Sequence, residues 1–201
     1  MTIVIALNDD KNDCIWFGCD TQGTLEDMDM SFGEKIFSLE VPVINCDEGD
    51  DEFITLNIGV SGSHFLMSYL THSFQPPSID TRWDFISYLY NKFFQKLQEE
   101  LSLHKLLKNE NEVIDSESSM IIIYENEIYE VYQDFSIFHE QIEEYSTIGS
   151  GWKIAEGVLH NLLKYHNEMD RKKIISETLH TVADKNIFCN DEIIIKKIKK
   201  V

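Results

Sequence analysis

The sequence predicts an α+β fold, a four-layer αββα sandwich in which two sheets lie between two pairs of helices. Runs of β-branched and aromatic residues alternate with segments whose apolar residues have helical spacing. Their order is strands, two helices, strands, two helices and a final strand. Two sheets between two helix pairs fit this order, because each sheet then buries both of its faces. At this length we expect residues 1–201 to form one domain with a sizeable core.

The opening strands flank polar, turn-rich stretches. Residues 2–8 and 14–20 are β-rich runs separated by the stretch NDDKND, which predicts a hairpin. A loop rich in Asp and Met follows, and a short strand is predicted over 35–39. An acidic loop over 45–52 then leads to a strand over 53–61.

The first helix pair begins after a glycine. Gly62 ends the preceding strand, and apolar spacing predicts a helix over 63–74. A longer amphipathic helix is predicted over 81–108, where an apolar stripe is more typical of core than of a cofactor site. The stripe consists of Trp83, Phe85, Ile86, Leu89, Phe93, Phe94 and Leu97.

The second half of the chain repeats the pattern of strands followed by helices. A hinge at Glu125 and Asn126 separates two strands, and the sequence Gly-Ser-Gly opens a helix. The predicted elements are strands over 118–125, 127–133 and 145–149, a helix from Gly149–Gly151 to residue 168, a helix from Asp170 to residue 186, and a strand over 192–198.

Composition and charge narrow the classes of function. The hydrophobic fraction of 43% and charged fraction of 26% are those of a globular protein, and no run approaches the ~20 apolar residues of a membrane span. The formal net charge of −19 repels phosphate backbones, so we expect no nucleic-acid partner. The N-terminus lacks the basic region of a signal peptide, which predicts a cytoplasmic location. Without a CxxC pair, the four cysteines are expected to be free buried thiols.

The most informative residue is the threonine at position 2. Removal of Met1 would place a hydroxyl and a free α-amine on Thr2. The pKa of an α-amine is about 7.7–8.0, so this amine could take the hydroxyl proton near neutral pH. Thr2 is therefore a candidate nucleophile with its own base. Small residues at position 2 are common, so its surroundings carry the argument.

The segments TIVIAL, GCDTQGT, EKIF, IGVSG and STIGSG resemble the proteasome β-subunit family in order and approximate spacing. The C-terminal segment VADKNIFCNDEIIIKKI is similar to that family's final helix, turn and strand. HslV-type peptidases, which work with a ring-shaped unfoldase, are the nearest resemblance. The resemblance to the proteasome β-subunit family spans nearly the whole chain and implies the fold of N-terminal nucleophile hydrolases.

The resemblance implies five catalytic residues. Thr2 matches the nucleophile, and Lys35 matches a lysine whose ammonium stabilises the developing alkoxide. Asp20 matches the acid that orients this lysine, Gly62 a glycine whose N–H faces the oxyanion, and Ser150 a serine that bonds the threonine amine. Taken alone, Asp20 and Lys35 could form a surface salt bridge, Gly62 could only end a strand, and Ser150 could cap a helix.

The resemblance also implies substrate and cation contacts. The main chain of Thr24 matches a strand that pairs with the substrate, and Gly33, Val60 and His64 fall near the family's first specificity pocket. Their apolar or neutral character predicts apolar residues before the cleaved bond.

The carbonyls of Ala183, Asn186 and Cys189 match positions that bind a structural monovalent or divalent cation in some relatives. No other cofactor is expected.

The leading hypothesis is a threonine peptidase that cleaves unfolded polypeptides inside a homo-oligomeric ring fed by an ATP-dependent unfoldase. The helices predicted over 63–74 and 81–108 would lie at the subunit contacts. One alternative is a non-catalytic proteasome-like assembly subunit, which retention of Met1 would favour. Another is an N-terminal nucleophile amidase acting on a small substrate, which a monomer or dimer would favour.

Overall fold

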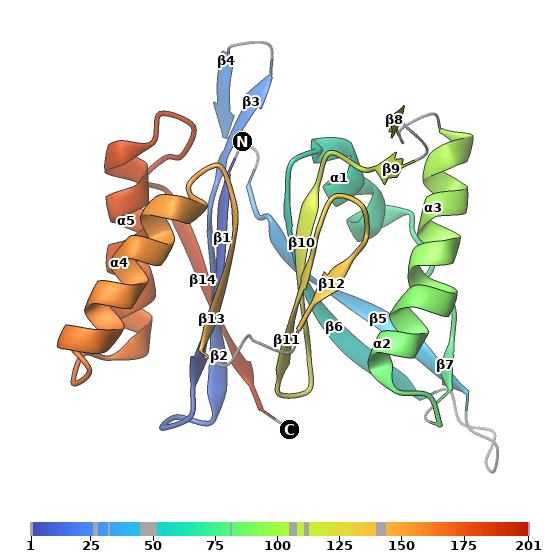
Figure 1. Cartoon of the computed structure of the whole chain (residues 1–201), viewed down its shortest axis with the longest axis horizontal. Coiled ribbons are helices and arrows are strands. Elements are labelled where there is room, and N and C mark those ends of the chain that lie inside the picture. Colours follow the sequence, from blue (N-terminus) through green and yellow to red (C-terminus); the bar gives the residue numbers. More distant parts are fainter. Residues whose placement is uncertain are drawn as a thin grey trace.

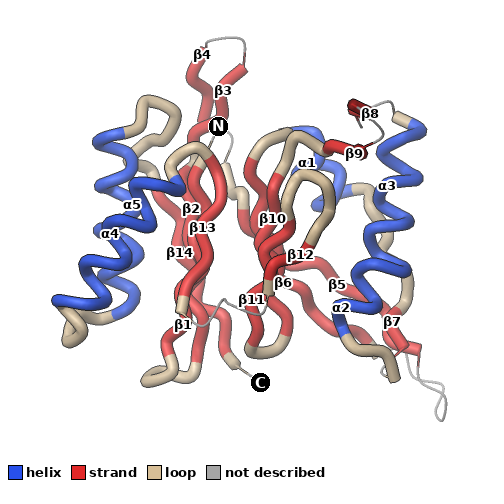
Figure 2. The backbone as a smooth tube through the Cα atoms, viewed as in Figure 1, coloured by secondary structure: helices blue, strands red, loops and turns tan. Residues whose placement is uncertain are grey.

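The computed structural model describes residues 2–25, 28–31, 33–44, 52–80, 82–104, 108–110, 113–139 and 144–200. Met1, Cys46 and most of the predicted acidic loop over 45–52 lie outside this part of the chain. The fold is mixed, with strands at the centre and helices on two outer sides (Figure 2).

The first sheet contains the N-terminal hairpin. Its strands, in spatial order, are β13 (Tyr145–Gly149), β1 (Ile3–Asp9), β2 (Cys14–Asp20) and β14 (Ile193–Lys199), and every neighbouring pair is antiparallel. β1 is apolar on both sides because both sides are covered. Ile3 and Ile5 pack toward helices, whereas Val4 packs toward the second sheet.

Two helices cover the outer side of this sheet, α4 (Trp152–Tyr165) and α5 (Arg171–Lys185) (Figure 1). α5 begins after Asp170, whose carboxylate accepts a hydrogen bond from the Lys173 N–H and caps the helix. Both helices were predicted, although α4 ends at Tyr165 and not at residue 168.

The second sheet has the order β12 (Ile137–Phe138), β11 (Glu127–Val131), β10 (Ser119–Tyr124), β6 (Phe53–Ser61), β5 (Ile36–Ile44) and β7 (Ile79–Asp80). All pairs are antiparallel except β5 with β7. β5 extends well beyond the predicted 35–39, because it continues to pair with β6 as far as Pro42 opposite Phe53. The pairing partner therefore determines the length of this strand.

The helices beside the second sheet are α1 (His64–His72), α2 (Phe85–Tyr88), the π-helix η1 (Leu89–Phe93) and α3 (Phe94–Leu103), the last three in one run (Figure 1). The prediction of a single helix over 81–108 is wrong at both ends. Asp84 caps the start, and residues 108–110 form β8 (Lys108–Glu110), which pairs with β9 (Val113–Asp115). Trp83 lies before the helix and is 40% exposed, so it is not part of the core.

A second hairpin occupies the predicted loop after β2. β3 (Gln22–Leu25) pairs with β4 (Met28–Ser31), and the two project beyond the main sheets (Figure 1). Neither strand was predicted from the sequence: Gln22–Leu25 has no apolar alternation, and in Met28–Ser31 the alternation of methionine with polar residues is only four residues long.

Three apolar clusters hold these elements together. One joins the second sheet to α1, α2, η1 and α3, another joins the first sheet to α4 and α5, and the third lies between the facing sides of the two sheets. Cys14, Cys19 and Cys189 are free and buried. Among the described helices, none has the length and apolarity that crossing a membrane requires.

Candidate active site

Thr2, Asp20 and Lys35 meet at one end of the two sheets. Thr2 directly precedes β1, Asp20 ends β2, and Lys35 directly precedes β5. The Thr2 Oγ1 donates to Asp20 Oδ1 at 2.5 Å, and the Lys35 Nζ donates to Thr2 Oγ1. Lys35 Nζ also contacts Asp20 Oδ1 at 2.8 Å. Three side chains from separate strand ends therefore share one hydrogen-bonded centre.

This centre is shielded from water. Thr2, Asp20 and Lys35 are 3%, 1% and 5% exposed, which excludes a surface salt bridge between Asp20 and Lys35. The ammonium of Lys35 has three donors, and its partners are Thr2 Oγ1, Asp20 Oδ1 and the carbonyl of Gln22. Asp20 also accepts from the backbone N–H groups of Ile3 at 2.9 Å and Gln22 at 3.1 Å. Burial of both charges is tolerated because each has several hydrogen-bond partners.

Ser150 lies on the other side of Thr2. Its Oγ donates to the carbonyl oxygen of Thr2 at 3.4 Å and accepts from the Asn186 Nδ2 at 3.3 Å. The expected partner was the threonine amine, whereas the described contact is to the carbonyl. Ser150 is not the cap of α4, because Gly151 holds that position without a side-chain hydrogen bond.

Gly149 brings β13 close to Thr2. Its φ is +105°, and a Cβ at this position would lie 2.0 Å from the Thr2 carbonyl oxygen and 3.1 Å from Ser61 Oγ. The close approach therefore requires glycine.

Replacement of this glycine should displace Thr2. We expect Gly149→Ala to lower the free energy of unfolding by about 1–3 kcal/mol or more, because an L side chain is strained at positive φ and meets backbone. Gly157→Ala is the matched control, since Gly157 lies in α4 with open space around its Cβ position and should gain roughly 0.5–1 kcal/mol. Urea denaturation of both variants measures the difference. Equal stability of the two variants would show that the contact with Thr2 imposes no constraint.

Gly62 follows β6 at the same end of the sheets. It has a φ of +116°, and a Cβ there would lie 2.3 Å from the carbonyl oxygen of Glu117. Its neighbour Ser61 is close to the position that a Gly149 Cβ would occupy, so the end of β6 lies beside Thr2. The turn that precedes β10 thus gives a structural reason for the glycine.

The residues predicted to contact the substrate are only partly brought together. The Val60 N–H donates to the Lys35 carbonyl at 3.1 Å, which places Val60 beside the centre. Gly33 has a φ of +82° with open space around it, and His64 is exposed at the first position of α1. Thr24 lies in β3 opposite Asp29 of β4. Val60 is the member of this set that a described hydrogen bond links to Lys35.

The predicted cation ligands lie at the end of α5. Ala183 is in the last turn, Asn186 is the C-cap, and the Asn186 carbonyl accepts the Cys189 N–H at 3.0 Å. Among the described residues, no group of three or more His, Cys, Asp or Glu side chains could hold a metal ion. A cation here would depend on carbonyl oxygens, one of which already has a hydrogen-bond donor.

The thiol of Cys189 belongs to the surroundings of the site, which the sequence did not predict. Burial, followed by the negative charge of Asp20, raises the pKa of Cys189 to about 12. The thiol is therefore neutral at pH 7 and is not a nucleophile.

Gln22 is a further residue near the site whose contacts sequence reasoning missed. Gln22 binds Lys35 through its carbonyl, Asp20 through its N–H, and the Ile187 carbonyl through its side chain at 3.2 Å. Main-chain groups carry two of these contacts, so the residue type leaves no signal in the sequence.

Three solved structures are similar to the chain over nearly its whole length. BPH from Thiobacillus denitrificans, in complex with epoxomicin, has a TM-score of 0.69 and 16% sequence identity, with 99% of each chain covered. HslV from Trypanosoma brucei has a TM-score of 0.60 and 18% identity, covering 98% of this chain and 99% of that chain. Anbu, an ancestral beta-subunit, from Yersinia bercovieri has a TM-score of 0.63 and 11% identity, covering 98% of this chain and 81% of that chain.

No protein-family model and no curated protein sequence matches this chain. At such low identities the likeness concerns the backbone and not the chemistry. The chain shares its fold with the structures of BPH, HslV and Anbu.

Proposed function

We propose that the chain is a threonine-type peptidase whose nucleophile is Thr2 after removal of Met1. The observation that carries this proposal is the buried contact of Thr2 Oγ1 with both the Lys35 ammonium and the Asp20 carboxylate. A cation beside the hydroxyl stabilises the alkoxide as it forms. An amide nitrogen cannot act as base, so the proposal requires the free α-amine of Thr2.

The proposed reaction proceeds through an ester of the Thr2 hydroxyl. The Thr2 Oγ1 attacks the scissile carbonyl while its proton passes to the α-amine, directly or through one water. The resulting oxyanion accepts a hydrogen bond from the Gly62 N–H. The protonated amine then gives its proton to the departing amine as the C–N bond breaks. Water, deprotonated by the same α-amine, attacks the ester and releases the acid product and Thr2.

Supporting residues have positioning roles in this scheme. Ser150, held by Asn186, fixes the Thr2 carbonyl and hence the orientation of the N-terminal residue. Thr24, Gly33, Val60 and His64 are proposed to contact the polypeptide on the β3 and α1 sides of Thr2, with an apolar residue preferred before the cleaved bond. The carbonyls of Ala183, Asn186 and Cys189 are the proposed ligands if a structural cation binds, and no catalytic step depends on it.

The proposal extends to the architecture and assembly. We assign residues 1–201 to one domain with the four-layer αββα sandwich of N-terminal nucleophile hydrolases, supported by the three apolar clusters. A homo-oligomeric ring that receives unfolded polypeptide from an ATP-dependent unfoldase would keep folded proteins away from Thr2. One of the similar structures is a helical assembly of the Anbu complex from Pseudomonas aeruginosa, which supports self-association of this fold.

Mass spectrometry of the purified protein, with and without an epoxyketone probe, tests the proposal. An epoxyketone offers two adjacent electrophilic carbons, which suit a residue that carries both a hydroxyl and a free amine. We expect loss of the Met1 mass, one probe adduct per chain on Thr2, and an oligomer under native conditions.

Retained Met1 with no adduct would contradict the proposal of a peptidase and favour a non-catalytic proteasome-like assembly subunit. Enzymatic removal of Met1 from the same sample separates the two cases, because a competent site should then be labelled. An adduct on a monomer would instead favour an amidase with a small substrate.

A further inference from the structure

A cavity of about 620 Å³ extends from Gly149, the neighbour of Thr2, along β13 of the first sheet, where this strand meets β10, β11 and β12 of the second. None of Thr2, Asp20 and Lys35 lines it. A smaller hollow of about 360 Å³ adjoins it, because Ser119 and Tyr132 line both. We call the two together the β13 groove.

Carboxylates are the charged groups that line the β13 groove. Glu130, Glu144 and Glu156 line the larger part, and Asp115 and Asp134 line the smaller one. No lysine, arginine or histidine is among the residues that line either part in the described chain. The groove is therefore strongly negative even within an acidic protein.

Most of this charge is not neutralised by other described residues. Glu144 pairs with Arg171 at 3.2 Å, whereas Glu130 and Glu156 make no ion pair within the described part of the chain. Glu130 accepts a hydrogen bond from the Ser146 hydroxyl at 2.6 Å. Burial raises the pKa of Glu130, as expected for a carboxyl group that lacks a cation.

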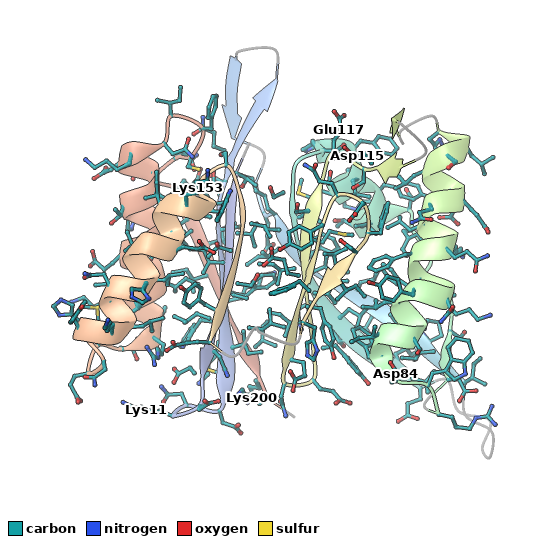
Figure 3. All side chains as sticks on the ribbon, in the orientation of Figure 1. Lys11, Asp84, Asp115, Glu117, Lys153 and Lys200 are labelled. Atoms are coloured by element: carbon teal, nitrogen blue, oxygen red, sulfur yellow. The ribbon has the colours of Figure 1, made fainter. Side chains whose placement is uncertain are left out.

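Aromatic rings form the rest of the wall. Tyr132, Phe138, Tyr145 and Trp152 line the larger cavity. Trp152 is 41% exposed, and the ammonium of Lys153 already lies 5.4 Å from the centre of its ring. Figure 3 labels Lys153 at the start of α4 and Asp115 near the second sheet. Aromatic faces and carboxylates together are the surroundings that organic cations prefer.

A further polar group in the groove lacks a partner. Thr147 lines the larger cavity, and its Oγ1 is buried with no hydrogen-bond partner in the described chain. An unsatisfied buried hydroxyl is costly, so this part of the groove wall lacks a hydrogen-bond donor among the described residues.

We propose that the β13 groove binds an organic polycation, with two or more ammonium or guanidinium groups on an apolar stem. The stem would lie against Trp152 and Tyr132 while the cationic groups reach Glu130 and Glu156. Two sources have this chemistry, a free polyamine and the basic side chains of an extended peptide. None of these contacts involves Thr2 or requires removal of Met1. Failure of the peptidase proposal would therefore not contradict the binding proposal.

Titration with two probes at 150 mM salt tests the proposal, because this ionic strength screens weak long-range attraction. The probes are spermidine and a capped tetrapeptide with two lysines, and the same peptide with acetylated lysines is the neutral control. We expect saturable binding by calorimetry and a change in tryptophan fluorescence that Trp152→Phe removes. Tighter binding of spermidine would identify a free polyamine as the ligand, and tighter binding of the dilysine peptide would identify an extended basic peptide.

Charge variants separate the groove from the general field of an acidic protein. The double variant Glu130→Gln with Glu156→Gln should weaken binding roughly tenfold. Glu177→Gln, an equal charge change on the exposed side of α5, should leave the affinity unchanged. If the double variant fails to fold, Glu156→Gln alone should weaken binding about threefold, since Glu156 is exposed.

The proposal is overturned if neither cationic probe saturates. It is also overturned if Glu177→Gln weakens binding as much as Glu156→Gln, or if Mg²⁺ or the acetylated peptide binds as tightly as the cationic probes. An effect of Glu177→Gln as large as that of Glu156→Gln would assign the attraction to the net charge of the protein and not to the groove.

Discussion

Thr2→Ala, in protein from which Met1 has been removed, is expected to abolish covalent labelling and to lower peptidase activity by at least about 10³-fold. The alanine retains the α-amine, Asp20 and Lys35, but it lacks the oxygen that would attack the scissile carbonyl. Thr2→Ser should keep labelling, because the serine hydroxyl can still contact Lys35 and Asp20. Labelling rate and hydrolysis of an unfolded protein substrate are the measurements.

Thr21→Ala is the matched control for this loss. Thr21 is also a buried threonine next to Asp20, but its hydroxyl donates to Glu192 at 2.9 Å and not to the Thr2 centre. We therefore expect Thr21→Ala to retain labelling of Thr2. An adduct that persists in Thr2→Ala would place the nucleophile elsewhere and end the proposal of an N-terminal threonine enzyme.

Lys35→Met should cause the largest loss of stability of any single substitution at the site. Methionine has a similar length but no charge, so the buried carboxylate of Asp20 loses its only described cation. Removal of one partner from a buried ion pair typically costs about 3–5 kcal/mol of unfolding free energy. The carbonyl of Gln22 and the Thr2 hydroxyl lose a donor at the same time. Denaturant unfolding and the labelling rate report the two effects separately.

A double-mutant cycle shows whether the cost arises from the unpaired charge. Lys35→Met combined with Asp20→Asn removes both charges and should recover part of the stability, although not the labelling. Arg82→Ala is the contrasting control, since Arg82 pairs with Asp80 on the exposed surface and its loss should leave the unfolding midpoint close to that of the wild type. A loss in Lys35→Met no greater than in Arg82→Ala would contradict the role of the buried pair.

Local patterns in the sequence predicted most strands and helices correctly. β1 and β2 could be predicted because β-branched and aromatic residues flank a polar turn. α5 could be predicted because Asp170 precedes a segment whose apolar residues have helical spacing. Such patterns depend on neighbours a few residues away, and the chain itself carries them. The same reasoning missed the short strands β3, β4, β7, β8, β9 and β12, and it placed the ends of the second helical run several residues too far out. Those features depend on pairing and capping partners that periodicity does not reveal.

For the candidate site, too, the sequence predicted the local position of each residue but not the contacts between residues. The sequence alone predicted that Thr2 and Lys35 begin strands and that Asp20 ends one, and the family resemblance linked the three. Only the tertiary structure decided that they share hydrogen bonds, that Ser150 contacts the Thr2 carbonyl, and that the Gln22 carbonyl completes the partners of Lys35. The β13 groove likewise had no signal in the sequence, because its carboxylates and rings come from separate strands and a helix. Residue type and local spacing are properties of a segment, whereas contacts between segments depend on sheet register and on how the two sheets pack.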